Sequence, residues 1–366
     1  MPRWIESPAY DLSFFFLPSV LAAAAGAACL WRPDLVAPLW WLWVWLIEGP
    51  HLAATYSRLY LDERERRDKA HLLKWSPAPV LACLAVWAVW LATGSPMPFQ
   101  LLLGAAAAAS YYHGARQHYG IMSLYHRYAG SGPRERSVDY WYLHIMLAAL
   151  FAIPLLSLAT NRMLLGLPVE LPASLAWAIS AAEAALALYT LWYVSDIVRR
   201  KREGHTIRPP LFALAPVGGL AVVAVFLVGP HEPIYSTPIN NEQLFLVVTL
   251  MGGIYHGVEY LGIALLADRR RHEKGHGLWS GVARSPALAY GVFVVGSLGY
   301  VILNASRGQA PGWAPLGIET ASAKLFLALY WGVFFHHYWL DQNLWKVQAD
   351  PRLQAELQLT PSPATR

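Results

Sequence analysis

Residues 239–267 read INNEQLFLVVTLMGGIYHGVEYLGIALLA. Crossing the hydrocarbon core of a bilayer takes roughly 20 mostly apolar residues as a helix, and this stretch is long enough. Because lipid offers no partner to an exposed backbone N–H or C=O group, such a segment must be helical. It nevertheless carries His256 and Glu259 in its middle. An ionisable side chain inside a span is costly, so we expect these two to face protein or water and to serve a function.

The same apolar pattern recurs along the whole chain. Of its 366 residues, 56% are hydrophobic and only 14% are charged, which is too apolar for an ordinary soluble protein. Candidate spans lie at residues 12–31, 35–60, 77–94, 98–126, 138–159, 173–198, 211–229, 239–267, 285–304 and 319–346. We predict an all-α, polytopic integral membrane protein of about ten transmembrane helices. It is expected to form a single domain over residues 1–366, with a short polar tail at 350–366.

Basic residues predict the orientation of these spans. Most of the 28 Lys and Arg residues fall in loops such as DERERRDK (62–69) and DRRRHEKGH (268–276), which share one side of the membrane with both termini. Because positively charged loops stay in the cytoplasm, both termini are predicted to be cytoplasmic, in a multi-pass protein of the inner (cytoplasmic) membrane. Attraction to anionic headgroups explains the net charge of +5, so membrane lipid is the expected partner and nucleic acid is not.

Five of the predicted spans carry polar side chains that belong to one layer. These are Glu48 and His51; His113, Arg116, Gln117 and His118; His144; His256 and Glu259; and His336, His337 and Asp341. At about 1.5 Å per helical residue, the spacing from the nearest charged loop puts one histidine of each span roughly 12–20 Å from the cytoplasmic boundary. A shared depth predicts that these side chains meet in the folded protein.

Their spacing suits metal binding. Glu48 with His51, His256 with Glu259, and His337 with Asp341 each place a nitrogen and an oxygen donor on one helix face. A Glu-x-x-His pair on a helix is how di-iron bundles present their ligands. A mixed imidazole and carboxylate set favours iron, manganese or zinc over copper(I). We predict iron, as two ions, with zinc or another divalent metal as the alternative; the candidate ligands are Glu48, His51, His113, His118, His144, His256, Glu259, His336, His337 and Asp341.

Two of the candidate ligands compete for one centre. His113 and His118 lie about 140° apart on an ideal helix, so both reach the same ion only if the helix bulges. Gly49 and Pro50, just before His51, are expected to open their helix, because proline removes a backbone hydrogen bond.

Arg116 raises a separate question, because a guanidinium inside a span needs an anion. Two interpretations stay open. Arg116 forms an ion pair with Glu48, Glu259 or Asp341, or it binds a substrate carboxylate or phosphate. With its neighbours Gln117 and Tyr119, it forms the set of residues that we predict to act in catalysis.

Two motifs carry a resemblance. The strings His113-x-x-Arg116-Gln117-x-Tyr119-Gly120 and His336-His337-Tyr338-x-x-Asp341-x-x-x-Trp345-Lys346 resemble those of bacterial multipass membrane proteins of unassigned activity. In strategy the chain is also similar to the histidine-rich membrane desaturases and hydroxylases, which hold two irons in His-x(3–4)-His and His-x-x-His-His boxes. Only His113-x-x-x-x-His118 resembles such a box, and here carboxylates accompany the histidines. The resemblance therefore implies a metal oxidase class without a ligand-by-ligand assignment.

These features favour a membrane-embedded, metal-dependent oxidoreductase of the oxygenase, hydroxylase or desaturase type. Its expected substrate is lipid-like or isoprenoid, because a site walled by apolar side chains is reached most easily from the lipid, and its electrons are expected from a cytoplasmic donor. Three alternatives stay open: a zinc-dependent hydrolase or transferase, a haem-binding redox protein, and a proton-coupled transporter.

Overall fold

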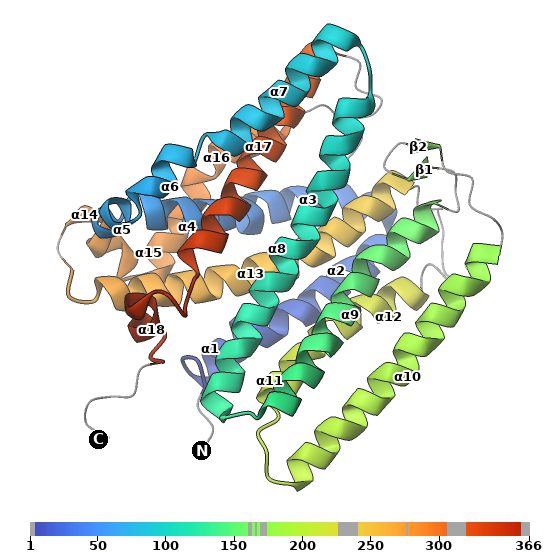
Figure 1. Ribbon diagram of the computed structural model, residues 1–366, viewed down its shortest axis with the longest axis vertical. Coiled ribbons are helices and arrows are strands. Elements are labelled where there is room, and N and C mark those ends of the chain that lie inside the picture. The colour runs from blue at the N-terminus through green and yellow to red at the C-terminus, as the bar shows by residue number, and fades with distance from the viewer. Residues whose placement is uncertain are drawn as a thin grey trace. The chain divides into compact units, whose positions relative to one another are not determined.

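The computed structural model describes residues 4–159, 163–164, 167–168, 174–225, 241–275, 277–305 and 320–359, and this part of the chain is almost entirely helical (Figure 1). A single short antiparallel pair joins β1 (Met163–Leu164) to β2 (Leu167–Pro168). Five helical segments are long and apolar enough to cross a membrane: Pro8–Trp31, Ala70–Thr93, Trp177–Arg202, Leu246–His272 and Pro286–Ala305. The predicted helical and membrane-spanning character is confirmed to this extent.

The full count of ten spans and the side on which the termini lie stay predictions. The other five predicted spans also coincide with helical segments, but these do not meet the same length and composition test. Residues 173, 226–229, 239–240 and 319 of the predicted spans, and residues 360–366 of the predicted tail, lie outside the described part of the chain.

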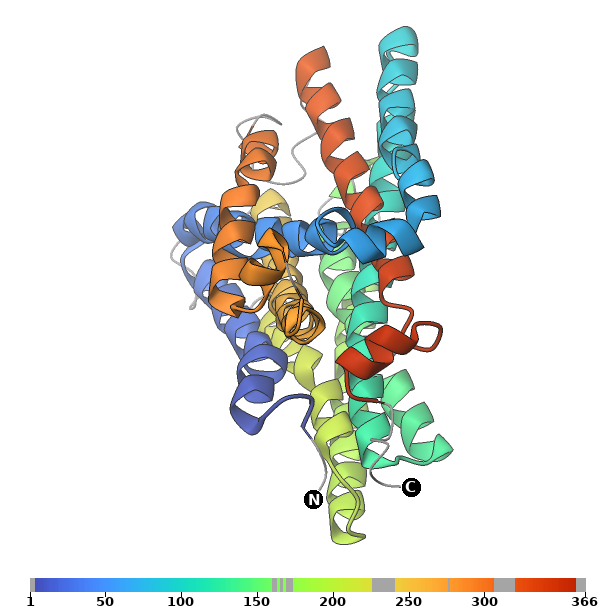
Figure 2. The same ribbon diagram turned by 90° about the vertical axis from the view of Figure 1, so that its left-hand side faces the viewer.

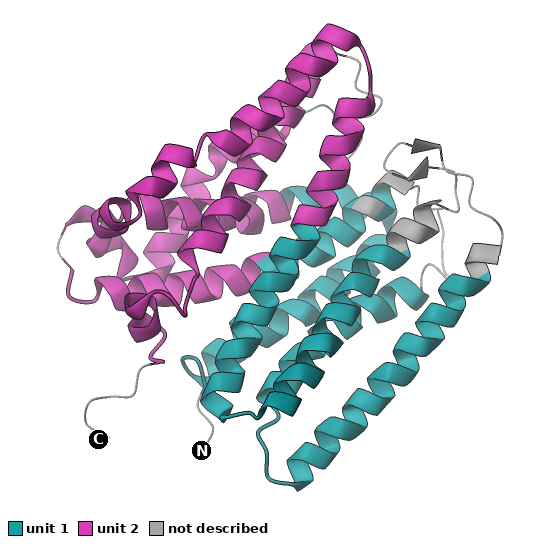
Figure 3. Cartoon of the chain, viewed as in Figure 1, with its two compact units in different colours: residues 1–41, 110–256 teal, residues 42–109, 257–366 magenta. Residues whose placement is uncertain are grey.

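The chain divides into two compact units, each built from two separate stretches of sequence (Figure 3). Unit 1 contains residues 1–41 and 110–256, and unit 2 contains residues 42–109 and 257–366. The boundaries fall inside α3 (Val36–Trp43), α8 (Met97–Ala129) and α13 (Asn241–His272), so these helices contribute residues to both units. The prediction of one domain over the whole chain is not tested by this division.

Unit 1 is a set of long helices packed side by side. Besides its parts of α3, α8 and α13 it contains α1 (Pro8–Asp11), η1 (Leu12–Phe16), α2 (Leu17–Trp31), η2 (Pro33–Leu35), α9 (Pro133–Ala159), α10 (Ser174–Arg202), α11 (Arg208–Ala213) and α12 (Ala215–Val223). Helix α12 packs against α2 and α9, and α9 also packs against α10 and α11. Small residues permit the close approach: a Cβ on Gly219 would lie 3.1 Å from Leu150 and Met251.

Unit 1 contains two buried polar clusters, one around Asp11 and one around Asp139. Asp11 accepts hydrogen bonds from the backbone N–H groups of Ile5 and Glu6 and from the Tyr125 hydroxyl, at 2.8–3.0 Å. In the second cluster, Arg200 of α10 donates hydrogen bonds to both carboxylate oxygens of Asp139 in α9, at 2.9 and 3.0 Å, and Asp139 is fully buried. Each buried carboxylate is therefore satisfied by several donors, which is what makes its burial tolerable.

Unit 2 contains the remaining helices. These are η3 (Val44–Glu48), α4 (Gly49–Tyr60), α5 (Glu63–Asp68), α6 (Ala70–Trp75), α7 (Ala78–Thr93), α14 (Leu278–Ala283), α15 (Pro286–Gly296), α16 (Leu298–Ala305), α17 (Ala321–Leu344) and α18 (Pro351–Glu356). Helices α7 and α17 run side by side, as both views show (Figures 1 and 2). Helix α4 packs against α15 and α17, and a core of Ala54, Tyr260, Leu261, Ala264, Leu265, Ala289 and Phe293 joins α4, α13 and α15.

The helix that carries His51 changes its geometry just before that residue. Residues Val44–Glu48 form a π-helix, and Gly49 and Pro50 then begin α4. Single π-helical turns inside helices are frequent at functional sites. Gly49 lies so close to α15 and α16 that a Cβ on it would be 2.4 Å from the Ser297 Cβ. Glycine is favoured there because the Ser297 side chain occupies the space that a Cβ would take.

A buried ion network joins α4, α5, α13 and α18 in unit 2. The Arg58 side chain is 2% exposed and lies 3.2 Å from Glu356 and 3.9 Å from both Glu65 and Asp268. Arg271 binds the same Glu356 at 2.6 Å and Glu65 at 2.8 Å. Removing one ion of such a network leaves its partners buried without compensation, so the network holds α18 firmly against the unit.

Candidate metal centre

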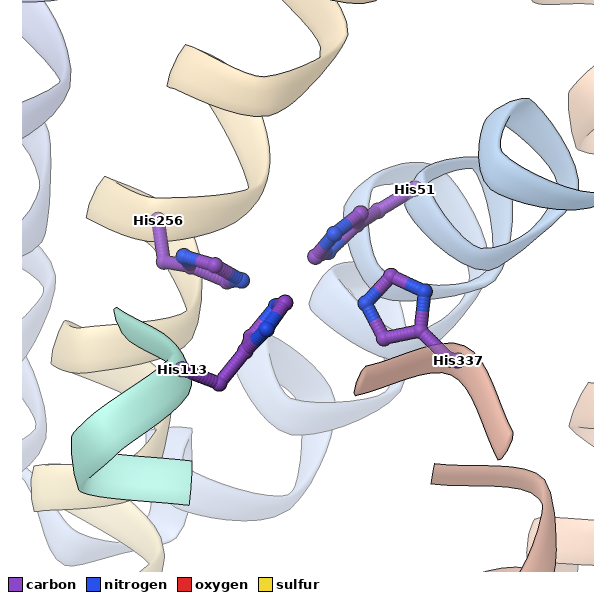
Figure 4. Close-up of side chains that lie close together, drawn as sticks. All are labelled: His51, His113, His256 and His337. Carbon is purple, nitrogen blue, oxygen red and sulfur yellow. The ribbon is translucent and has the colours of Figure 1, made fainter. Parts of the chain in front are cut away.

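In unit 2, the imidazole rings of His51 and His337 lie next to each other. Their ring centroids are 4.5 Å apart with an interplanar angle of 86°, and the two residues are 1% and 0% exposed (Figure 4). His51 comes from the first turn of α4, directly after the π-helix, and His337 comes from the C-terminal half of α17. Both residues were predicted from the sequence as ligands, and unit 2 brings them together.

A hydrogen-bonded group of side chains supports this pair. The Tyr260 hydroxyl lies 2.7 Å from Thr55 Oγ1 and donates to Asp341 Oδ1 at 2.8 Å. Thr55 also donates to Asp341 Oδ1 at 2.9 Å. The other carboxylate oxygen of Asp341 lies 3.6 Å from His337 Nε2, and the Tyr260 ring lies 4.3 Å from the His51 ring. Asp341 is thus hydrogen-bonded to Thr55 and Tyr260 beside the pair, while its distance from His337 Nε2 exceeds that of a hydrogen bond.

In unit 1, His113 from α8 and His256 from α13 form a second pair. Their ring centroids are 4.8 Å apart with an interplanar angle of 75° (Figure 4). Gln117, one turn after His113, donates to the backbone carbonyl of His256 at 2.8 Å. This bond ties α8 to α13 at the level of the two rings. Gln117 is thus a residue that positions the pair, although its predicted catalytic role is not tested.

The remaining predicted residues of unit 1 lie around this pair. His118 is buried and stacks on Tyr255 at 3.9 Å, with its ring centroid 6.1 Å from that of His256. The regular helix α8 runs past both histidines, and His113 is the one whose ring lies nearer to that of His256, which the sequence left open. His144 binds the Tyr140 carbonyl through Nδ1 at 2.8 Å and lies near the Tyr119 ring.

The other predicted residues are His336, Glu48 and Glu259 of unit 2 and Arg116 of unit 1. His336 stacks on Tyr56 with ring centroids 5.3 Å apart, so it points along a different face of α17 from His337. Glu48 and Glu259 are buried, at 4% and 0% exposure. Arg116 is an exposed residue of α8. The ligand roles of the two glutamates and of His336, and the anion of Arg116, stay predictions.

Sequence reasoning missed Thr55 and Tyr260, and it placed Trp345 in a motif without a role. Trp345 Nε1 donates to the Tyr260 hydroxyl at 3.1 Å, so it belongs to the same group. The signal that could have found them was spacing: Tyr260 follows His256 by four residues and Thr55 follows His51 by four, which places each pair on one helix face. Neutral hydroxyl residues are too common in helices for this spacing to stand out.

Four buried or half-buried imidazoles are a donor set suited to a transition metal. Neutral imidazole nitrogen suits zinc, copper, iron and nickel, and a nearby carboxylate that orients the ring strengthens the ligand. Comparisons with models of known families, with curated proteins and with solved structures found no match to this chain. The chemistry of these side chains is therefore the basis of the functional assignment.

Proposed function

We propose that His51, His113, His256 and His337 bind one metal ion, and that the protein is a membrane-embedded, non-haem iron oxidoreductase. The observation that carries this proposal is the presence of two histidine pairs, each at ring contact distance, in apolar helices. The proposal joins the two pairs into one donor set of four imidazole nitrogens. Four nitrogens suit one ion, whereas the two irons predicted from the sequence need further ligands.

Helix α13 supports the joining of the two pairs. It runs unbroken through His256 of unit 1 and the next residue, Gly257, which belongs to unit 2. Within unit 2, His51 Nδ1 lies 3.9 Å from the position that a Cβ on Gly257 would take. Gly257 follows His256 directly in the chain, so the residue beside His51 is bonded to His256.

The surroundings of the histidines support chemistry on a lipid-soluble substrate. Each pair includes a buried histidine, and α13, which carries His256, is long and apolar enough to cross a membrane, so a polar substrate has no favourable route to it. Four neutral imidazoles would hold an iron ion without cancelling its positive charge, and the ion would supply the activation of dioxygen. Hydrogen bonds among Asp341, Thr55 and Tyr260 hold these three side chains beside the histidine pair of unit 2. Oxidation of an isoprenoid or other lipid-like molecule is the reaction class that this combination favours.

The same proposal includes the topology. Ten spans with cytoplasmic termini would place the protein in the inner membrane, with the Arg58 and Arg271 network at the cytoplasmic ends of α4 and α13. Labelling of single cysteines placed in the charged loops, with a membrane-impermeant reagent on intact and opened cells, tests this orientation. The two native cysteines, Cys29 and Cys83, are buried and give a low background.

Metal content tests the assignment directly. Elemental mass spectrometry on detergent-purified protein is expected to find one iron per chain, with no haem band in the absorption spectrum. His256→Ala and His337→Ala, one from each pair, are each expected to remove most of the metal. His71→Ala is the matched control, because His71 is an exposed histidine of α6 outside both pairs.

The results separate the alternatives as well. Zinc in place of iron would support a hydrolase or transferase, and a haem band would support an electron carrier. Loss of metal from only one of the two variants would show that the pairs do not share an ion. Full metal retention in both would refute the proposed site.

A further inference from the structure

The histidine pair of unit 2 is joined to the charged end of that unit by a chain of aromatic contacts. The His51 ring lies 4.3 Å from the Tyr260 ring, and Tyr260 lies 5.8 Å from Trp345, centroid to centroid. The Trp345 Nε1–H group donates to the Tyr260 hydroxyl at 3.1 Å. The Arg58 guanidinium lies 4.5 Å above the Trp345 ring. These contacts form a continuous path from the ion network to His51.

Trp345 occupies the end of the path that is closest to solvent. It is the residue at which α17 ends, it is half-buried, and the next residue, Lys346, is exposed. Tyr260, by contrast, is 2% exposed, and His51 is 1% exposed. The path therefore runs from a site that a soluble molecule can approach to a site that it cannot reach.

We propose that Trp345 and Tyr260 form the route by which a soluble one-electron carrier protein reduces the metal at the histidines. This inference rests on the proposed iron site. One electron leaves the carrier, which is oxidised by one electron, and the ferric ion becomes ferrous. Trp345 and Tyr260 keep all their protons and electrons, since their rings and hydrogen bond serve only to shorten the distance through which the electron must pass.

The arrangement favours this role over a purely structural one. An apolar core needs no tryptophan with a hydrogen bond to a buried tyrosine, because leucine fills a helix interface equally well. The same hydroxyl also bonds to Thr55 and Asp341, so the Tyr260 ring is fixed in orientation toward His51. Lys346, which is exposed and follows Trp345 directly, provides a positive charge at this end that an acidic carrier protein can recognise.

A light-triggered experiment measures the route. A ruthenium photosensitiser is attached to Lys346→Cys, beside Trp345, in the full chain loaded with ferric iron. Both native cysteines are buried, so the label attaches only to the new cysteine. Lys346 makes one exposed hydrogen bond, to Asn343, so its replacement should disturb the fold little. A flash then drives one electron from the excited ruthenium complex to the iron, and the rate of loss of the ferric absorption is recorded.

Trp345→Leu in this labelled chain is expected to slow the reduction at least about tenfold, with iron content unchanged. Trp339→Leu is the control, because it makes the same change on the same helix outside the contact path. Trp345→Phe keeps a ring but loses the bond to Tyr260, so its rate is expected between those of the wild type and the leucine variant. If the leucine variant fails to hold iron, the phenylalanine variant decides.

Equal rates in the wild type and in the tested Trp345 variant, at equal iron content, would overturn the inference and leave the metal site standing. Equal slowing by Trp339→Leu would overturn it too, because the path would then not be specific. Absence of bound metal from the wild-type chain, measured first, would refute the proposed function itself.

Discussion

Gly257 offers a sharp test of the packing beside the candidate centre. A Cβ on this residue would lie 2.6 Å from Ile47 Cγ2, closer than real Cβ atoms come to any heavy atom, and 3.9 Å from His51 Nδ1. Overpacking of this kind costs about 1–3 kcal/mol. Alanine in a helix is favoured over glycine by about 1 kcal/mol, which offsets part of this cost. Gly257→Ala is therefore expected to be about 0–2 kcal/mol less stable than the wild type.

A matched glycine isolates the steric part. Gly291 lies in the interior of α15 and is exposed, and a Cβ on it would meet no heavy atom within 4 Å, so Gly291→Ala should be neutral or stabilising. The difference between the two variants, measured by denaturant unfolding in mixed micelles, is expected to be about 1–3 kcal/mol. Ile47→Ala removes the clashing methyl group, so it should cancel most of this difference in a double-mutant cycle. Equal stability of Gly257→Ala and Gly291→Ala, or no coupling to Ile47, would refute the close approach of η3 and α13.

Three further changes have expected outcomes. Arg58→Met leaves Glu356 without one of its buried cations, so the unfolding free energy should fall by about 3–5 kcal/mol. Arg199→Met is the control, because it removes an exposed ion pair and should change the unfolding free energy little. Similar effects of the two changes would argue against the buried network. Burial tends to raise the pKa of Asp62, but the backbone N–H groups of Glu65 and Arg64 and the charge of Arg271 hold it below its usual value. Asp62 thus stabilises the fold above pH about 4 and loses this effect at lower pH, so the stability gap between wild type and Asp62→Asn should shrink on acidification; a constant gap would contradict it. Removing the metal with a chelator should lower the unfolding midpoint of the wild type but not that of His337→Ala, and an equal drop in both would place the metal elsewhere.

Hydrophobicity was enough to predict a helical membrane protein, because a long apolar segment in lipid must satisfy its backbone hydrogen bonds within itself, as a helix does. It was less able to predict how the helices divide. The segment predicted as one span over residues 35–60 contains α3, a π-helix and α4, since the Gly49–Pro50 step and the close contact with Ser297 interrupt a regular helix. Such a break depends on a neighbour that is remote in sequence, which a hydrophobicity pattern does not contain.

The candidate site was predicted in its residue types but not in its pairing. Depth in the membrane singled out one layer that contains His51, His118, His144, His256 and His337, because an imidazole inside a span is costly. In the structure, however, His144 contacts Tyr140 and His118 stacks on Tyr255. His113, on the same helix as His118, is the residue that pairs with His256. The sequence predicts how deep a residue lies in the membrane, but it does not predict which neighbouring helix its side chain faces. That depends on the rotation of each helix about its axis, which packing decides.

The interleaved units have a consequence for biosynthesis. Residues 42–109 of unit 2 leave the ribosome long before their partners at 257–366, and residues 1–41 must wait for 110–256. His51 is therefore made long before His337, its neighbour in unit 2. Membrane insertion of α4 must precede its assembly with α17 by the time needed to synthesise the residues between them. Iron loading at the proposed centre then belongs after the synthesis of α17, and a chain truncated before α17 would lack half of unit 2's histidine pair.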